Sequence, residues 1–247
     1  MPESPIVHRA VSLNSVILAV GIAVSGLLAG SGFVRAKQAE RFVTVKGVSE
    51  REAQADLAIW PLRIVAASND LGAANSQIQA SVRKIRAFLG RHGVDTTGLT
   101  LQDFAVTDAQ ANIYSGDRGG PRYVITQTLM VRSAAPQVVA AASQRVAELV
   151  SEGVVLSSGE QYGNGGPTFV FTKLNELKPA MIAEATARAR EAAAQFAADA
   201  GSALGGIRQA NQGYFEILPR EQAMGISEAS QLNKTIRVVA TVEYLLK

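Results

Sequence analysis

The longest apolar stretch of the chain lies near its N-terminus. Residues 16–34 read V-I-L-A-V-G-I-A-V-S-G-L-L-A-G-S-G-F-V and contain no charged side chain. At about 1.5 Å per residue, a helix of this length spans roughly 30 Å, which is the thickness of the hydrocarbon core of a bilayer. The pattern predicts a short N-terminal tail and a transmembrane anchor over residues 1–36, with the span from Val16 to Val34.

After residue 37 the pattern changes to alternating strands and amphipathic helices. The first part predicts two strands, a helix and two more strands. The charged run 49–54 predicts a turn between the first two strands, and Pro61 predicts an edge or a bulge in the second, because proline cannot donate a ladder hydrogen bond. The predicted strands are 41–48, 56–67, 99–106 and 122–132, and the helix begins at Leu71 and ends at Gly90 or Gly93.

The remaining sequence predicts two more helices and four more strands. A helix is expected from Pro136, because proline suits the first turn, to a stop at Gly153. A longer helix follows from about Asn175 to Ala200. Strands are expected at 154–161, 168–172, 207–218 and 235–246.

This order of elements predicts an α+β domain over residues 37–247. Runs of strands with three main helices favour a mostly antiparallel sheet. The succession of two strands, a helix and two strands occurs twice, which suggests an internal duplication of residues 41–132 and 154–246, although the two halves share no residue pattern.

The long helix is rich in alanine, which permits close approach to a sheet or to a partner helix. Packing on its own sheet is the main interpretation, and a subunit contact is the alternative. The predicted inward face recurs at steps of three and four residues and consists of Met181, Ala185, Ala189, Ala192 and Phe196.

The orientation of the anchor is ambiguous. One basic residue, Arg9, precedes the apolar stretch, and Arg35, Lys37 and Arg41 follow it. Taken alone, this count places the domain in the cytoplasm. A cleaved signal peptide, with a small-residue site at 29–31, is the alternative to an uncleaved anchor. Within the apolar stretch, the G-x-x-x-G spacing of Gly26 and Gly30 is compatible with close helix–helix association in lipid.

Composition excludes several kinds of partner and chemistry. The formal net charge is +3 with no basic run, so nucleic-acid binding is not expected. Cysteine is absent, which excludes disulfides, thiolate catalysis and cysteine metal sites. The two histidines, His8 and His92, have no acidic or histidine partner at ligand spacing, so neither a metal nor a cofactor is expected.

One alternative function rests on Asp103 and Asp108, which lie around the end of a predicted strand. Two carboxylates together with the glycine-rich loops 116–120 and 159–166 could serve a small-ligand binder or a hydrolase. Neither loop opens a helix or precedes Lys-Ser/Thr, as a phosphate cradle would. We therefore interpret them as hairpin loops and predict no catalytic, cofactor or metal residue.

Three segments resemble the SIMPL-domain family of bacterial exported or membrane-anchored proteins. They are V-T-V-K-G-V-S-E-R-E-A-Q-A-D-L-A (43–58), the alanine-rich helix with its Gly-x-x-Leu-Gly turn (181–207), and K-T-I-R-V-V-A-T-V-E-Y-L-L (234–246). Ala55 departs from the family, which more often has proline there. The resemblance implies an α+β domain in the periplasm or at the cell surface, ring-like homo-oligomers in some members, and links to envelope or oxidative stress without a known reaction.

These observations lead to one main functional expectation. The chain is expected to be a non-enzymatic, single-pass inner-membrane protein with its domain in the periplasm, where it self-assembles or binds envelope partners. The resemblance supplies no catalytic residue to carry over, and the residues name no small-molecule ligand.

Overall fold

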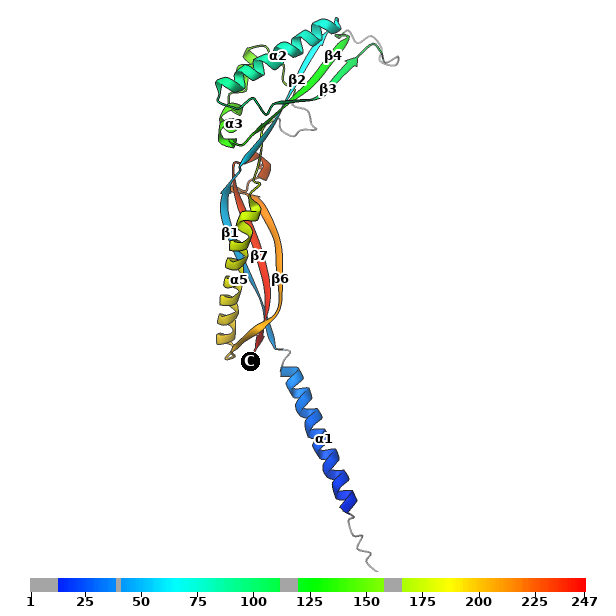
Figure 1. Ribbon diagram of the computed structural model, residues 1–247, viewed down its shortest axis with the longest axis vertical. Coiled ribbons are helices and arrows are strands. Elements are labelled where there is room, and N and C mark those ends of the chain that lie inside the picture. Colours follow the sequence, from blue (N-terminus) through cyan, green and yellow to red (C-terminus); the bar gives the residue numbers. More distant parts are fainter. Residues whose placement is uncertain (1–12, 39–40, 112–119, 158–165) are drawn as a thin grey trace, which may run out of the picture. The chain divides into compact units, whose positions relative to one another are not determined.

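The computed structural model describes residues 13–38, 41–111, 120–157 and 166–247 and forms an α+β fold (Figure 1). This confirms the α+β part of the predicted fold class. The elements are α1 (Leu13–Gln38), β1 (Phe42–Gln54), β2 (Leu57–Ser68), α2 (Leu71–Arg91), β3 (Thr100–Asp108), β4 (Tyr123–Ser133), α3 (Pro136–Ser143), α4 (Ala147–Ser151), β5 (Thr168–Val170), α5 (Leu174–Asp199), β6 (Leu204–Pro219), the 3-10 turn η2 (Glu228–Ser230) and β7 (Asn233–Leu246).

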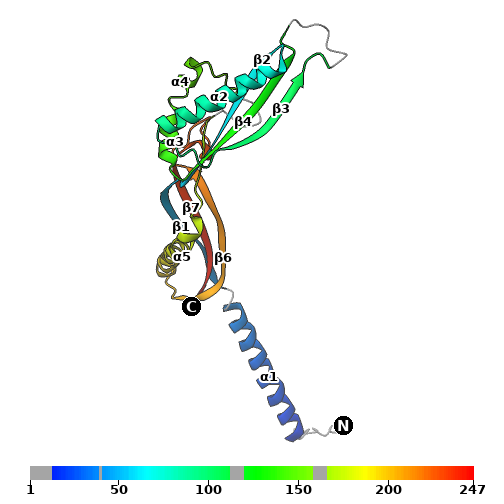
Figure 2. The same cartoon turned by 45° about the horizontal axis from the view of Figure 1, so that its top comes forward.

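The strands form two sheets. The four-stranded sheet has the order β3-β4-β2-β5, and its neighbouring strands are all antiparallel. The three-stranded sheet has the order β1-β7-β6 (Figure 2). The Leu246 nitrogen donates to the Arg41 oxygen and the Ala55 nitrogen donates to the Leu232 oxygen, so β1 and β7 also run in opposite directions.

The chain divides into two compact units. One takes described residues from 1–48, 182–213 and 239–247, and the other takes them from 49–181 and 214–238. The predicted boundary at residue 37 and the suspected duplication of 41–132 and 154–246 stay predictions.

In the second unit, α2 covers one face of the four-stranded sheet. The Asp70 carboxylate caps α2 by accepting from the Ala73 nitrogen at 2.6 Å. Every second residue of β2 from Ala58 to Ala66 is buried, as expected for a strand with one covered face. The buried face of α2 consists of Ala74, Ile78, Val82, Ile85, Phe88 and Leu89.

Helix α5 packs along the three-stranded sheet through alanines. Ala185, Ala189, Ala193 and Ala197 are buried at steps of four residues, whereas Phe196 is 60% exposed. The inward assignment of Phe196 is therefore wrong. Four residues advance about 40° beyond one full turn, so a contact line at steps of four rotates around the helix axis. A line drawn at mixed steps of three and four stays on one face and misses this rotation.

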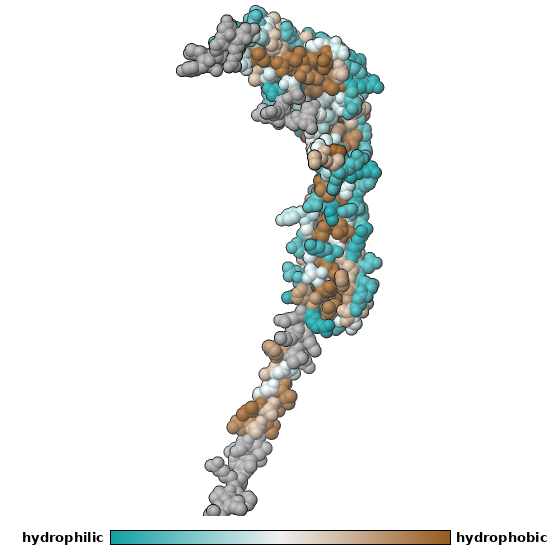
Figure 3. Space-filling model, turned by 180° about the vertical axis from the view of Figure 1, so that it is seen from behind, coloured by the Kyte–Doolittle hydropathy of each residue, from teal (hydrophilic) through white to brown (hydrophobic). Residues whose placement is uncertain are grey.

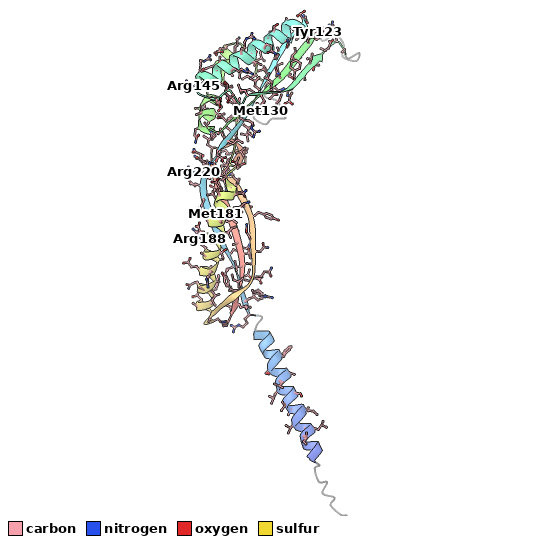
Figure 4. The ribbon with its side chains drawn as sticks, viewed as in Figure 1. Tyr123, Met130, Arg145, Met181, Arg188 and Arg220 are labelled. Carbon is pink, nitrogen blue, oxygen red and sulfur yellow. The ribbon has the colours of Figure 1, made fainter. Side chains whose placement is uncertain are left out.

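The other predicted inward residues of α5 are buried or half-buried. Met181 is fully buried, and Ala192 is half-buried against Val45, Val242 and their neighbours. The outer side of α5 carries Arg188, labelled in Figure 4, which pairs with Glu184 one turn earlier at 2.7 Å.

The predicted turn at 49–54 is wrong, because β1 continues through Gln54. The two glutamates of this segment pair with arginines from other parts of the chain. Glu50 lies 3.2 Å from Arg237 on β7, and Glu52 lies 3.5 Å from Arg220. Cross-strand ion pairs of this kind let a charged sequence remain in a sheet.

The helix predicted from Pro136 toward Gly153 is two helices, α3 and α4. Between them, Arg145 and Val146 donate to carbonyls three residues earlier, and the Ser143 hydroxyl bonds the Ala140 carbonyl at 2.8 Å. Such back-bonding competes with the helix ladder. The strand expected at 154–161 is a single bridge between Leu156 and Ile64 in its described part, and residues 158–161 lie outside the described residues.

Pro61 lies inside β2, opposite Met130 on β4, in an unbroken register. Of the two predicted alternatives, an edge or a bulge, the bulge is therefore wrong. On the side away from β4, β2 bonds β5 at residues 57–59 and bonds residues 155–157 from Arg63 and Val65. Like Arg63 and Val65, Pro61 directs its main-chain groups to the side of β2 away from β4. Its nitrogen lies after the stretch paired with β5 and before the stretch paired with residues 155–157. The missing donor thus costs no described ladder bond.

Helix α1 exposes apolar side chains along its described length, as the brown atoms of Figure 3 illustrate. Ile17, Leu18, Leu27 and Phe33 are each more than 60% exposed. Within the described residues, no helix combines the length and the apolar character that crossing a membrane requires. The helix predicted around 16–34 is present, and its predicted role as a span is not supported by this finding.

Candidate functional site

Asp103 and Asp108, the sequence's candidate carboxylates, both lie on the edge strand β3. Asp103 has a φ of 51° and sits where the β3–β4 register shifts between Gln102 and Ala105. Five residues of strand extend roughly 15 Å, whereas paired glycosidase carboxylates lie about 5–9.5 Å apart. The structure therefore does not bring these two side chains together as a catalytic pair.

Asp108 is engaged by Arg122. The Arg122 Nε lies 3.2 Å from each carboxylate oxygen, and its second guanidinium nitrogen lies 3.0 Å from Oδ2. These hydrogen bonds hold the pKa of Asp108 below its ordinary value of 3.8. The Arg122 guanidinium also lies 4.9 Å from the ring centre of Tyr123, labelled in Figure 4. Asp108, held in its charged form, therefore links the end of β3 to the start of β4. A carboxylate that stays charged has no proton to give and is a poor general acid.

A third carboxylate, Asp56, joins the start of β2 to the segment after β5. Its two oxygens accept from the Thr172 nitrogen at 2.8 Å and from the Thr172 hydroxyl at 2.7 Å. Partial burial alone would raise the pKa of Asp56, but these hydrogen bonds lower it below the ordinary value. Both acceptor oxygens are used inside the fold, so Asp56 is a structural residue.

The neighbouring Ala55 explains one departure from the family resemblance. Its nitrogen donates to the Leu232 oxygen at 2.8 Å, and its side chain is buried. A proline at this position could not donate that bond. Alanine thus adds a hydrogen bond between the end of β1 and the segment before β7.

His92 has a partner that sequence spacing did not reveal. Its Nε2 lies 3.0 Å from the Glu148 carboxylate, and its ring meets the Phe88 ring edge-on at a centroid distance of 4.6 Å. The two residues are 56 positions apart, so spacing rules for one element could not find them. In the described ranges, no group of three or more His, Cys, Asp or Glu is placed to hold a metal ion.

The remaining candidates are small-residue features. Gly26 and Gly30 lie on α1 with no described atom within 4 Å of where a Cβ would be. The glycine-rich loops at 116–120 and 159–166 lie outside the described residues except for Gly120 and Gly166. No described arrangement therefore unites the loops with Asp103 and Asp108.

Comparison with known proteins gives a family for this chain. A search of curated proteins found no match. The family model described as "SIMPL: Protein of unknown function (DUF541)" matches residues 43–244, from the second residue of β1 almost to the end of β7. Because this match covers far more than half of the chain, the protein belongs to the SIMPL family.

Proposed function

We propose that this protein is a non-enzymatic, membrane-anchored component of the bacterial envelope that acts by self-assembly or by binding partners. One observation carries the proposal: a helix with exposed apolar side chains, uncharged over residues 16–34, immediately precedes a SIMPL domain. The proposal includes no catalytic activity, because Asp103 and Asp108 do not form a carboxylate pair and Asp108 is ion-paired with Arg122.

The anchoring part of the proposal rests on residues 16–34. They carry no charge, and α1 has exposed apolar side chains such as Ile17, Leu18 and Leu27. Hydrocarbon is the surrounding that such a surface prefers. A shallow groove along α1, lined by Ile17, Leu18, Gly21, Ile22, Ser25, Gly26 and Ala29, would let a second helix approach closely.

The periplasmic location rests on the family resemblance and runs against the count of basic residues around the helix. The link to envelope or oxidative stress rests on the resemblance alone.

A topology reporter tests the anchor and its direction. Alkaline phosphatase fused after Lys247 should be active, because this enzyme folds into its active form outside the cytoplasm. A matched fusion of a fluorescent protein that matures only in the cytoplasm should stay dark. An inactive phosphatase fusion together with a fluorescent second fusion would show that the domain lies in the cytoplasm. Recovery of both fusions from the soluble fraction would refute the anchor.

A mass measurement tests self-assembly. The full chain in mild detergent should elute as a homo-oligomer, with a protein mass several times 26.0 kDa after correction for detergent. Gly26→Ile fills the groove on α1, and Gly30→Ile removes the other glycine of the G-x-x-x-G spacing, so the double variant should lower that mass if the helix contributes to assembly. A wild-type protein of monomeric mass at micromolar concentration would refute self-assembly and leave partner binding as the proposal.

A further inference from the structure

Strand β3 forms one edge of the four-stranded sheet (Figure 1). In the described parts of the chain it pairs with β4 alone, and every residue from Thr100 to Thr107 is exposed. Three of these residues are large and apolar: Leu101 is 45% exposed, Phe104 53% and Val106 46%. An edge strand with exposed apolar side chains is a surface to which another strand can add.

The register with β4 assigns the side chains of β3 to the two faces of the sheet. Leu101 lies opposite Leu129, and Val106 lies opposite Ile125. Both partners belong to the hydrophobic core that contains the buried face of α2, so Leu101 and Val106 lie on the face that α2 covers. The residues on the other face are Thr100, Gln102, Ala105 and Thr107.

A bulge interrupts β3 between these two sets of residues. Asp103 and Phe104 together take the place of one residue in the register with β4, and Asp103 has a φ of 51°. A bulge commonly protects an edge from further pairing, because an ordinary strand has no extra residue to match it. A second copy of β3 carries the same extra residue at the same place.

Two copies of β3 fit one another in one antiparallel register. In this register Leu101 of one copy lies opposite Val106 of the other, and Gln102 lies opposite Ala105. Each pair joins side chains of the same face, and the two-fold symmetry repeats each pair. A shift by one residue would set opposite faces against each other. The exposed Leu101 and Val106 would thus cover one another as cross-strand pairs.

The same register accommodates the bulge and the carboxylates. Asp103 lies opposite Phe104 of the other copy, so bulge faces bulge and the pairing continues past both without a further shift. Asp108 is held by Arg122 of its own chain and lies opposite Leu99 of the other copy. No carboxylate of β3 therefore faces a carboxylate, an arrangement that would destabilise the pair.

We propose that β3 is the surface through which two copies of this chain associate, by joining their four-stranded sheets edge to edge. The two-fold axis is perpendicular to the sheets, so the helices α2 of both copies lie on the same face of one continuous sheet. Main-chain hydrogen bonds hold the two strands together, and Leu101, Phe104 and Val106 supply the apolar contact. The inference rests on the proposed self-assembly and names its contact; it does not require a membrane anchor.

Disulfide linkage tests this register cleanly, because the chain contains no cysteine. Thr100 and Thr107 lie opposite each other in the paired copies, whereas within one chain the strand separates them by about 20 Å. The full chain in mild detergent with both Thr100→Cys and Thr107→Cys should therefore form a disulfide-linked dimer on oxidation and no internal disulfide. Each single variant is a matched control and should give a dimer yield about tenfold lower, because its two thiols lie far apart in the pair.

A charged substitution tests the apolar contact. Val106→Lys, added to the two cysteine substitutions, should lower the yield of linked dimer about tenfold, because lysine on an edge strand opposes pairing. Val150→Lys makes the same change at a side chain of α4 that is 60% exposed, and it should leave the yield unchanged. Both valines are exposed, so neither substitution disturbs the core.

The mass of the wild-type chain in the same detergent distinguishes two kinds of failure. An oligomeric mass, with no more linked dimer in the double cysteine variant than in the single variants, would overturn pairing through β3 and leave self-assembly in place. A monomeric mass without linked dimer would refute both. Linkage of the double cysteine variant to a different protein in place of its own copy would assign the edge to that partner and overturn the proposal.

Discussion

Gly47→Ala should lower the free energy of unfolding by about 3 kcal/mol, at the upper end of the range for overpacked cores. A Cβ at Gly47 would lie 2.5 Å from the Ala189 nitrogen and would overlap the Ala185 oxygen. Both are main-chain atoms of α5, so no side-chain rotation relieves the clash. The helix must move away from β1 and lose its contacts with Val45 and Val242.

Gly206→Ala is the matched control, since it makes the same change in a strand of the three-stranded sheet. No described atom lies within 4 Å of where its Cβ would be. Its effect should be within about 1 kcal/mol, and a small stabilisation is compatible with the reduced freedom of the unfolded chain. Urea melts of both variants in the same detergent give the comparison. Equal melts would mean that α5 does not approach β1 as closely as described.

Glu228→Ala should destabilise the chain by about 3–5 kcal/mol, because it leaves Lys234 buried without its counter-charge. The Lys234 side chain is fully buried on β7 and pairs with the Glu228 carboxylate. Its Nζ also donates to the Glu228 main-chain oxygen at 2.6 Å, a bond that the variant can keep. That oxygen is uncharged and offsets only part of the desolvation of the ammonium group.

The reverse substitution separates the charge from the packing. Lys234→Met keeps the length of the side chain and leaves Glu228 at a half-exposed position, so it should cost much less than Glu228→Ala. The double variant should recover most of the loss caused by Glu228→Ala. A double variant as unstable as Glu228→Ala would show that the loss comes from the turn η2 itself and not from an unpaired lysine.

The spacing of hydrophobic residues predicted correctly those helices whose buried residues stay on one constant face. Helix α2 has one constant buried face because it crosses the sheet with residues at mixed steps of three and four. Helix α5 follows steps of four, and the assignment of Phe196 fails where the rotation has accumulated most. The extent of β1 was missed for another reason: Glu50 and Glu52 look like turn residues until Arg237 and Arg220 are placed beside them.

The candidate site was less predictable because its contacts join distant parts of the sequence. His92 meets Glu148 through the packing of α2 against α4, which no spacing rule describes. Asp103 and Asp108 are close in sequence, and an extended strand keeps them apart. Proximity in sequence and proximity in space agree within a helical turn and diverge along a strand.

The four-residue repeat of Ala185, Ala189, Ala193 and Ala197 makes the helix face nearly periodic. A slide of α5 by four residues, about 6 Å along its axis, would exchange one alanine for the next and alter few contacts on that face. The helix face therefore cannot define its own register on the sheet. Its C-terminal end can: Gly201 turns the chain with a φ of 63°, and Ser202 bonds the Ala197 oxygen at 2.8 Å before β6 begins. Insertions of four residues within the alanine repeat would preserve the packing and transfer the whole mismatch to that turn.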